Sequence, residues 1–247
     1  MQSLKSEEIQ RNKIELAAAL RWASRLGLSE GICNHFSLAV SVEGDQFLVN
    51  PMGYHWREIT ASDLVLADKD RRILQGDKKV EDSAFFIHSR IHLAKPQARC
   101  VLHTHMPYAT ALCLLDKGRL EMASQNAIRF FNRIAYIDDY EGLAFDSSEG
   151  DRLASAMGDK DIAFLAAHGV IVSGPTVADA FDELYYLERA CQSQIIAQSS
   201  GQKLRILPEA VVSSVAPVMN SGLATMRCLH FEAIKRILDR EEPEYRN

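Results

Sequence analysis

Two histidines that lie two residues apart, His103 and His105, stand at the end of an apolar stretch of the chain. Side chains alternate along a β-strand, so both imidazoles of such a pair point to the same face. Each ring carries polar nitrogens that need partners, and this leaves two interpretations. The pair consists of hydrogen-bonded core or rim histidines, or it binds a metal ion, because catalytic zinc is commonly held by three protein ligands with one open position.

A third imidazole comes from His168, which follows the apolar residues 162–166 and directly precedes Gly169. A glycine here permits a close approach or an unusual backbone angle, so the chain can bring His168 beside the first pair. This favours the metal interpretation, in which His103, His105 and His168 bind one divalent metal ion per subunit, and leaves the hydrogen-bonded interpretation open. Zinc is the favoured ion, and manganese, iron or cobalt are alternatives.

The elements that must position these residues are a mixture of helices and strands. Hydrophobic periodicity and turn residues predict a domain built around a largely antiparallel or mixed sheet. We expect one α/β domain over residues 1–247, with a C-terminal helix and tail from about residue 205. The predicted helices cover 6–27, 82–94, 107–117, 149–157, 176–199 and 222–239, and the predicted strands cover 36–41, 47–49, 64–67, 72–74, 133–137 and 162–166, besides the strand that carries His103.

Composition excludes several classes of function. The 247 residues carry a formal net charge of −5 and contain no long basic run, so we expect no nucleic-acid partner. The five cysteines form no Cys-x-x-Cys pair, which argues against a thiolate zinc site and favours a reducing compartment. A polar N-terminus and the lack of any run of 18 apolar residues predict a cytoplasmic protein with no membrane partner.

Several short segments together resemble the class II aldolase/adducin family over nearly the whole chain. The resemblance implies a three-layer α/β/α sandwich with a mainly antiparallel central sheet. It also implies a zinc-like metal on the three histidines and a homotetramer with sites at subunit interfaces. In the sugar-phosphate aldolases of that family the metal stabilises an enediolate and a glutamate moves the proton. The matching segments are residues 31–37, 47–53, 58–64 and 88–92, followed by Lys95-Pro96, His103-Thr104-His105 and His168-Gly169.

Departures from the family pattern affect the acid/base and the phosphate site. The family glutamate corresponds to Ala84, so Glu81 and Asp82 become the candidates that could replace it. At a phosphate-binding step the family has Thr-Gly or Ser-Gly, whereas this chain has Met52 before Gly53, and methionine offers no donor. Asp82 would also repel a phosphate, so a sugar phosphate is a poor substrate. The chain resembles the adducin-like bacterial branch more closely.

The remaining candidates lie where the family binds its substrate. His35 could contact a carboxylate or act as a general acid, or it is an exposed loop histidine. Asn34, Ser37 and Gly53 could contact substrate, or the two polar side chains could simply form turns. Arg129 could bind a substrate carboxylate, although solvated arginine is the commoner case.

Two further features are open to structural interpretations. His88 and His92 are spaced four residues apart on a predicted helix, which would suit a second metal. Because no carboxylate completes such a site, we expect a structural role for both. Tyr245 lies in the C-terminal tail, which in some relatives of the family reaches a neighbouring subunit's site; the alternative for this chain is a disordered tail.

Three functions follow as hypotheses. The first is a metal-dependent carbon–carbon lyase, of the decarboxylase or aldolase type, which acts on a small non-phosphorylated hydroxy/keto or aromatic carboxylate. The second is an Fe(II)-dependent oxygenase that uses the same three histidines. The third is an adducin-like interaction module without catalysis. The lyase hypothesis predicts a small-molecule substrate chelated through two oxygens, with His35, Glu81 or Asp82 near it.

Overall fold

A computed structural model describes residues 2–142 and 146–247, and their centre is an eight-stranded sheet in the order β4-β3-β2-β1-β5-β8-β7-β6. Among the described strands only the β6–β7 pair is parallel, which confirms the expected mainly antiparallel sheet. The strands are β1 (His35–Ala39), β2 (Gln46–Val49), β3 (Val65–Asp68), β4 (Ile73–Gln75), β5 (Cys100–Thr104), β6 (Ile134–Ile137), β7 (Ile162–Leu165) and β8 (Gly169–Gly174).

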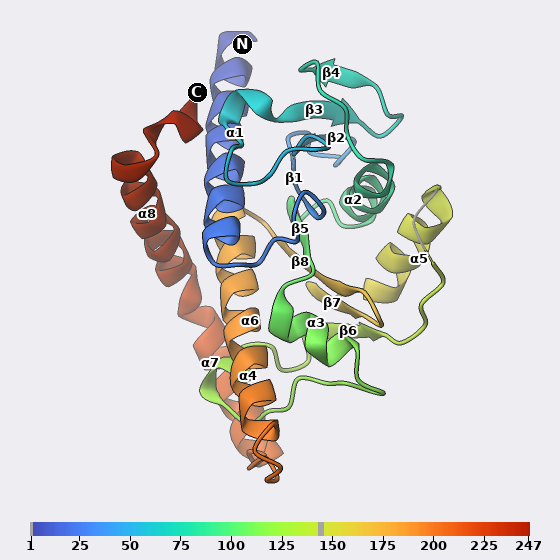
Figure 1. The fold of residues 1–247 in the computed structure, drawn as a ribbon, viewed down its shortest axis with the longest axis vertical. Helices are drawn as coiled ribbons and strands as arrows, with labels where there is room; N and C mark the ends of the chain where they lie inside the picture. The colour runs from blue at the N-terminus through green and yellow to red at the C-terminus, as the bar shows by residue number, and fades with distance from the viewer. Residues whose placement is uncertain (1, 143–145) are drawn as a thin grey trace.

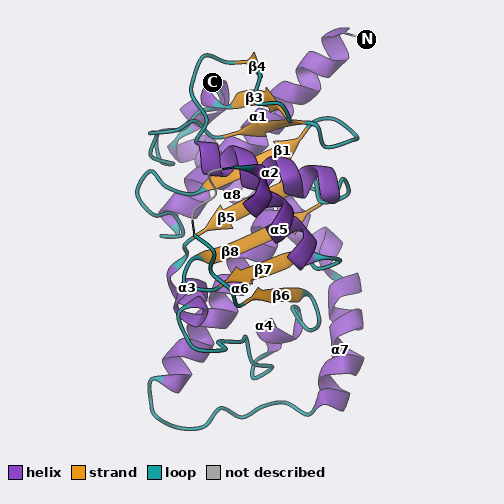
Figure 2. Cartoon of the chain, turned by 90° about the vertical axis from the view of Figure 1, so that its right-hand side faces the viewer, coloured by secondary structure: helices purple, strands orange, loops and turns teal. Residues whose placement is uncertain are grey.

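Helices cover both faces of this sheet, which gives the expected three-layer α/β/α sandwich (Figures 1 and 2). Helices α2 and α5 pack on one face, while α1, α3, α6 and α8 lie on the other. None of the described helices is both long and apolar enough to cross a membrane. The helices are α1 (Gln2–Arg25), α2 (Asp82–Ala94), α3 (Pro107–Cys113), α4 (Gln125–Ile128), α5 (Ser147–Met157), α6 (Val177–Gln198), α7 (Glu209–Ser221) and α8 (Leu223–Glu241), with 3₁₀ turns η1 (Ala61–Asp63) and η2 (Pro243–Arg246).

The side-chain alternation along strand β5 determines on which face of the sheet His103 lies. Leu102 belongs to the large core beneath α1 and α6, whereas Val101 belongs to the smaller core beneath α2 and α5. Successive side chains of a strand point to opposite faces, so His103 shares the face of Val101. It therefore lies on the side of the sheet that α2 and α5 cover.

Three sequence expectations need correction. The stretch predicted as one strand over 162–166 is the first half of a hairpin, because β8 runs back antiparallel from Gly169 and leaves His168 in the connection. Helix α7, which includes Pro217, was not predicted. The C-terminal tail packs on its own chain, since Tyr245 is fully buried and its hydroxyl hydrogen-bonds Asp239 at 2.9 Å.

Candidate metal centre

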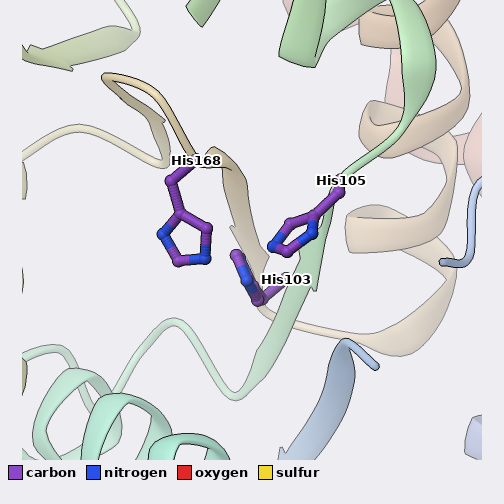
Figure 3. Close-up of side chains that lie close together, drawn as sticks. All are labelled: His103, His105 and His168. Atoms are coloured by element: carbon purple, nitrogen blue, oxygen red, sulfur yellow. The ribbon is translucent and has the colours of Figure 1, made fainter. Parts of the chain in front are cut away.

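Three histidines converge at one end of the sheet, on the edge of the layer formed by α2 and α5 (Figure 3). His103 lies in β5, His105 follows directly after this strand, and His168 lies in the turn between β7 and β8. One potential ligand atom from each ring lies within 4.8 Å of the others. The ring centroids are 4.8 to 5.0 Å apart, which fits three ligands of one shared metal ion.

The turn that carries His168 depends on two special backbone positions. Ala167 adopts a left-handed conformation with φ of +55°, which is costly for a residue with a side chain. Its amide donates to the Cys113 carbonyl at 3.0 Å and so ties the turn to α3. At Gly169 an added Cβ would lie 2.5 Å from the Thr104 carbonyl oxygen and 2.8 Å from Cδ2 of His105, so only glycine permits this approach.

Hydrogen bonds at the far side of two rings leave the inward nitrogens free. His103 Nδ1 lies 3.0 Å from the Val170 carbonyl, so we assign its proton to Nδ1 and a lone pair to Nε2. His105 Nδ1 hydrogen-bonds the Glu30 carboxylate, and its buried Nε2 has no partner among the described residues. An outer hydrogen bond of this kind is how proteins fix a metal-ligating histidine.

Burial keeps the rings of His103 and His168 neutral. It lowers the pKa of His103 well below the usual value of a histidine, and the neighbouring imidazoles add to the effect. Burial also lowers the pKa of His168 to about 4. Neutral imidazole is the form that binds metals. The donor set therefore fits one divalent ion such as zinc, with coordination positions left open for substrate or water.

Behind the three rings lies a chain of hydrogen-bonded side chains that starts at His35. His35 Nδ1 is 2.8 Å from His88 Nε2, and Ser37 hydrogen-bonds both His88 and His92, the latter at 2.7 Å. All four side chains are buried, and burial lowers the pKa of His92 to about 3 against a smaller opposing effect of the Ala98 backbone. Burial and nearby imidazoles lower the pKa of His35 well below its usual value. The expected structural role of His88 and His92 is thus to hold His35.

The metal centre opens into a cavity of about 210 Å³. Its walls carry three carboxylates and one arginine among the described residues, and that arginine, Arg152, is held by Glu149 through two hydrogen bonds of 2.7 Å. The polar lining beside the three histidines includes Asn34, His35, Glu81, Ser83, Asp139, Tyr140, Glu149 and Arg152, and the apolar lining includes Ile87, Ile137, Leu153 and Leu165.

Asn34 has a second task besides lining the cavity. It is in the left-handed region, with φ of +77°, which asparagine tolerates better than most residues. Its side-chain oxygen accepts hydrogen bonds from the backbone amides of Glu30 at 3.1 Å and His105 at 3.3 Å. Its buried Nδ2 has no partner among the described residues, so the amide retains a donor that a substrate could use.

The structure places four other predicted positions away from the cavity. Asp82 pairs with Arg71 at a separate hollow on the far side of α2, and Gly53 lies on an exposed loop. Ser37 is fully buried behind His35. Arg129 is buried against Asp182, 2.5 Å from it, and does not line the cavity.

The position of the absent family glutamate is also not part of the cavity wall in this chain. Ala84 is buried in an apolar cluster with Phe47 and Val49. The acid that faces the cavity from this segment is Glu81, which precedes α2. Of the two acids predicted from the sequence, the structure thus brings only Glu81 to the site.

Sequence reasoning missed Glu30, Glu149 and Arg152. Glu30 lies 75 residues before the histidine that it contacts, and no local pattern links them. Glu149 and Arg152 look like an ordinary helical ion pair of the (i, i+3) type. Only the packing of α5 over the sheet reveals that this pair forms a wall of the cavity.

Comparison with known proteins agrees with this fold. Residues 14–195 match the model of the "Class II Aldolase and Adducin N-terminal domain". A solved structure of an aldolase II superfamily protein from Pseudomonas syringae superposes with a TM-score of 0.89 at 36% identity and covers 96% of both chains. The chain belongs to the class II aldolase and adducin family.

Relatives in this family are described by different activities. A class 2 aldolase-type protein of Pseudomonas aeruginosa is 32% identical over 95% of this chain and 91% of its own length. The decarboxylase NovR of Streptomyces niveus is 30% identical over 86% of this chain and 77% of its own. A protein of Streptomyces roseochromogenus named 4-hydroxy-3-prenylphenylpyruvate oxygenase/4-hydroxy-3-prenylbenzoate synthase is 30% identical over 76% and 69%.

Proposed function

We propose that this protein is a metal-dependent carbon–carbon lyase, of the decarboxylase or aldolase type, for a small non-phosphorylated hydroxy/keto or aromatic carboxylate. The observation that carries the proposal is the convergence of three imidazoles on one point beside a cavity. His103, His105 and His168 would hold the ion, with zinc favoured over manganese, iron and cobalt. A bound divalent metal supplies a Lewis acid that stabilises the negative charge left when the carbon–carbon bond breaks.

Proton transfer falls to residues that line the cavity. In a decarboxylation the bond to the carboxyl carbon breaks, CO₂ leaves, and the remaining carbon takes up one proton. His35 lines the cavity, and its Nδ1 is already engaged by His88, so its Nε2 is the nitrogen left to exchange a proton with substrate. Glu81 also lines the cavity and is the second candidate for this step.

The lining of the cavity favours a particular substrate class. Its volume of about 210 Å³ lies below the usual 300–1,000 Å³ of drug-sized ligand sites, so a compact molecule is expected. Apolar side chains such as Ile87 and Leu153 suit an aromatic ring or short carbon chain. Three wall carboxylates against one arginine, which is already paired, disfavour a phosphate with about two negative charges more strongly than a substrate with a single carboxylate. Asn34 Nδ2 remains as a donor for a substrate oxygen.

An Fe(II)-dependent oxygenase is the second candidate, because neutral imidazoles also suit iron and one relative is named as an oxygenase. Oxygen consumption separates the two reactions, since a lyase needs none. An adducin-like non-catalytic module is the third. No described feature requires it, and three convergent imidazoles have no evident use in such a module.

The direct test is turnover. Protein purified with its metal would be incubated with a hydroxylated aromatic carboxylate, a 2-keto acid and a hydroxy-keto acid, while CO₂, the cleavage products and dissolved oxygen are followed. We expect cleavage without oxygen uptake for one of these classes and a loss of at least about 100-fold in His103→Ala. Stoichiometric oxygen uptake would replace the lyase by the oxygenase, and cleavage that persists in His103→Ala would overturn the proposal.

We further infer, from the family, a cytoplasmic homotetramer with a small-molecule substrate and neither nucleic acid nor membrane as partner. The net charge of −5 supports the absence of a polyanion partner. Analytical ultracentrifugation tests the oligomer, and a sedimenting species of one or two chains would contradict it.

A further inference from the structure

Glu30 is the acidic residue that touches the proposed metal centre from outside the histidine motif. It lies in the loop between α1 and β1, and its carboxylate hydrogen-bonds His105 Nδ1. The carboxylate side chain is 64% exposed, whereas that of His105 is only 22% exposed. A partly exposed acid therefore contacts the outer nitrogen of a ring whose inner nitrogen is buried.

The shape of this loop aims Glu30 at His105. The Asn34 side chain joins the two, because its oxygen accepts from the amides of both Glu30 and His105. The Cys33 amide donates to the Glu30 carbonyl at 2.9 Å and closes the loop on itself. Two hydrogen bonds thus fix the Glu30 backbone, and a third links Asn34 to the His105 backbone, so the loop holds Glu30 beside the ring that its side chain contacts.

The contact decides which nitrogen of His105 can bind a cation. A carboxylate only accepts hydrogen bonds, so it retains the ring proton on Nδ1 and leaves the lone pair on Nε2. That Nε2 is buried and has no partner among the described residues. A carboxylate on the outer nitrogen also makes a histidine a stronger ligand.

We propose that Glu30 is a positioning residue of the metal centre, which orients His105 and strengthens its bond to a divalent cation. The proposal rests on the metal site of the proposed function but concerns a residue outside its ligands. Loss of such an outer partner typically lowers metal affinity 10- to 100-fold.

The experiment measures zinc affinity and needs no substrate. Wild type, Glu30→Ala, Glu30→Gln and His103→Ala would compete with a chromogenic chelator for zinc alone. Glu43→Ala is the matched control, because Glu43 is an exposed acid in the turn between β1 and β2 and makes no side-chain hydrogen bond within the described chain. The visible spectrum of the Co(II)-substituted proteins reports changes at the ligands, and far-UV circular dichroism reports the fold.

We expect zinc affinity to fall 10- to 100-fold in Glu30→Ala with an altered Co(II) spectrum and unchanged circular dichroism. Glu30→Gln retains a hydrogen-bond acceptor without the charge and should lie between Glu30→Ala and wild type. Affinity within about twofold of wild type in Glu30→Ala, or an equal loss in Glu43→Ala, would overturn the role of Glu30. Zinc binding that survives in His103→Ala would instead overturn the metal centre itself.

Discussion

Two clusters of buried and half-buried polar side chains lie on opposite faces of the sheet, and their members find partners in different ways. The ionic cluster joins α6 to α4, β6 and α8, and the histidine cluster joins β1, β5 and α2 to the β7–β8 turn. The ionic cluster comprises Arg129, Arg133, Asp182, Glu183, Arg227 and His230. The histidine cluster comprises His35, His88, His92, His103, His105 and His168.

In the ionic cluster opposite charges meet inside the chain. Asp182 accepts hydrogen bonds from Arg129 at 2.5 Å and from His230 at 2.7 Å. Arg133 lies 3.1 Å from Glu183, which also pairs with Arg227. Burial alone would raise the pKa of Asp182, but the hydrogen bonds from His230 and Arg129 outweigh this effect and lower the pKa. The charges of this cluster pair with one another inside the chain, while Arg129 Nε, Glu183 Oε2 and Arg227 Nε have no hydrogen-bond partner among the described residues.

In the histidine cluster the members are of one kind, and they are not complementary. Burial lowers the pKa of His103 and His168, so these rings stay neutral, and each presents a nitrogen to the same point. Lone pairs that converge cannot satisfy one another, whereas a cation satisfies all of them. The difference teaches that buried side chains of opposite charge, which pair with one another, have a structural role. Buried side chains that all present the same kind of lone pair to one point indicate a ligand.

The largest expected effect that separates the two clusters is the response of the metal-free protein to acid. The native pKa values of His92 and His168 are about 3 and about 4, so below pH ~6.5 the unfolded chain binds protons that the native chain does not. Stability should therefore fall with decreasing pH by ~1.4 kcal/mol per pH unit for each such histidine. The lowered pKa of Asp182 means that its contribution is lost only below its unfolded value of 3.8.

Urea unfolding of metal-free protein between about pH 7 and about pH 5 measures this slope. The variant His92→Leu removes one such histidine, so the slope of the free energy of unfolding against pH should fall by ~1.4 kcal/mol per pH unit. A free energy of unfolding that stays constant over this range would show that the histidines are not buried as neutral groups.

The next prediction concerns a substitution that disrupts only the ionic cluster. Asp182→Ala leaves the buried Arg129 with only its longer contact of 3.7 Å to Glu183, and the free energy of unfolding should fall by up to about 3–5 kcal/mol. Zinc affinity should stay as in wild type, because Asp182 touches none of the three metal-binding candidates. Chemical denaturation and zinc competition measure both quantities, and a parallel loss of zinc affinity would show that the clusters are not independent.

A smaller loss of stability is expected from a substitution at Gly169, where β8 begins beside the candidate metal centre. In Gly169→Ala the new methyl group would collide with the Thr104 carbonyl and the His105 ring, which costs about 1–3 kcal/mol and should weaken zinc binding. Gly222→Ala is the control, because an added Cβ there meets only atoms at 3.8 Å. Equal stability and zinc affinity for both variants would contradict the close approach.

The smallest effect concerns the left-handed residue of the β7–β8 turn. Ala167→Gly relieves a conformation that costs about 1–2 kcal/mol but increases the entropy of the unfolded chain. We expect a net stabilisation of less than about 1 kcal/mol. Ala166→Gly, at a residue without positive φ, should be destabilising instead, and thermal unfolding of both variants tests the sign.

The sequence predicts those parts of the site that local spacing determines. His103 and His105 share a face because of strand alternation, and the apolar residues around them place the strand in the core. The expected sandwich and mainly antiparallel sheet are present. Family resemblance adds His168, which the structure brings to within ligand distance of the other two.

The parts that could not be predicted depend on contacts between distant segments. The hairpin around His168 turns at Ala167, where the sequence shows no glycine or asparagine to mark a left-handed residue. The sequence leaves Glu81 and Asp82 as equal candidates for the acid/base. At the start of α2, however, Asp82 pairs with Arg71, and only Glu81 lines the cavity. The sequence leaves Arg129 either solvated or available to a substrate carboxylate, because it does not show that Asp182 of α6 pairs with it.

The central claim, that the three histidines form a metal centre, is tested most directly by elemental analysis. Wild type, His103→Ala and Asp182→Ala would be purified without chelators, and bound divalent metal would be counted per chain. We predict about one equivalent in wild type and in Asp182→Ala, and almost none in His103→Ala. Equal metal content in wild type and His103→Ala would contradict the claim.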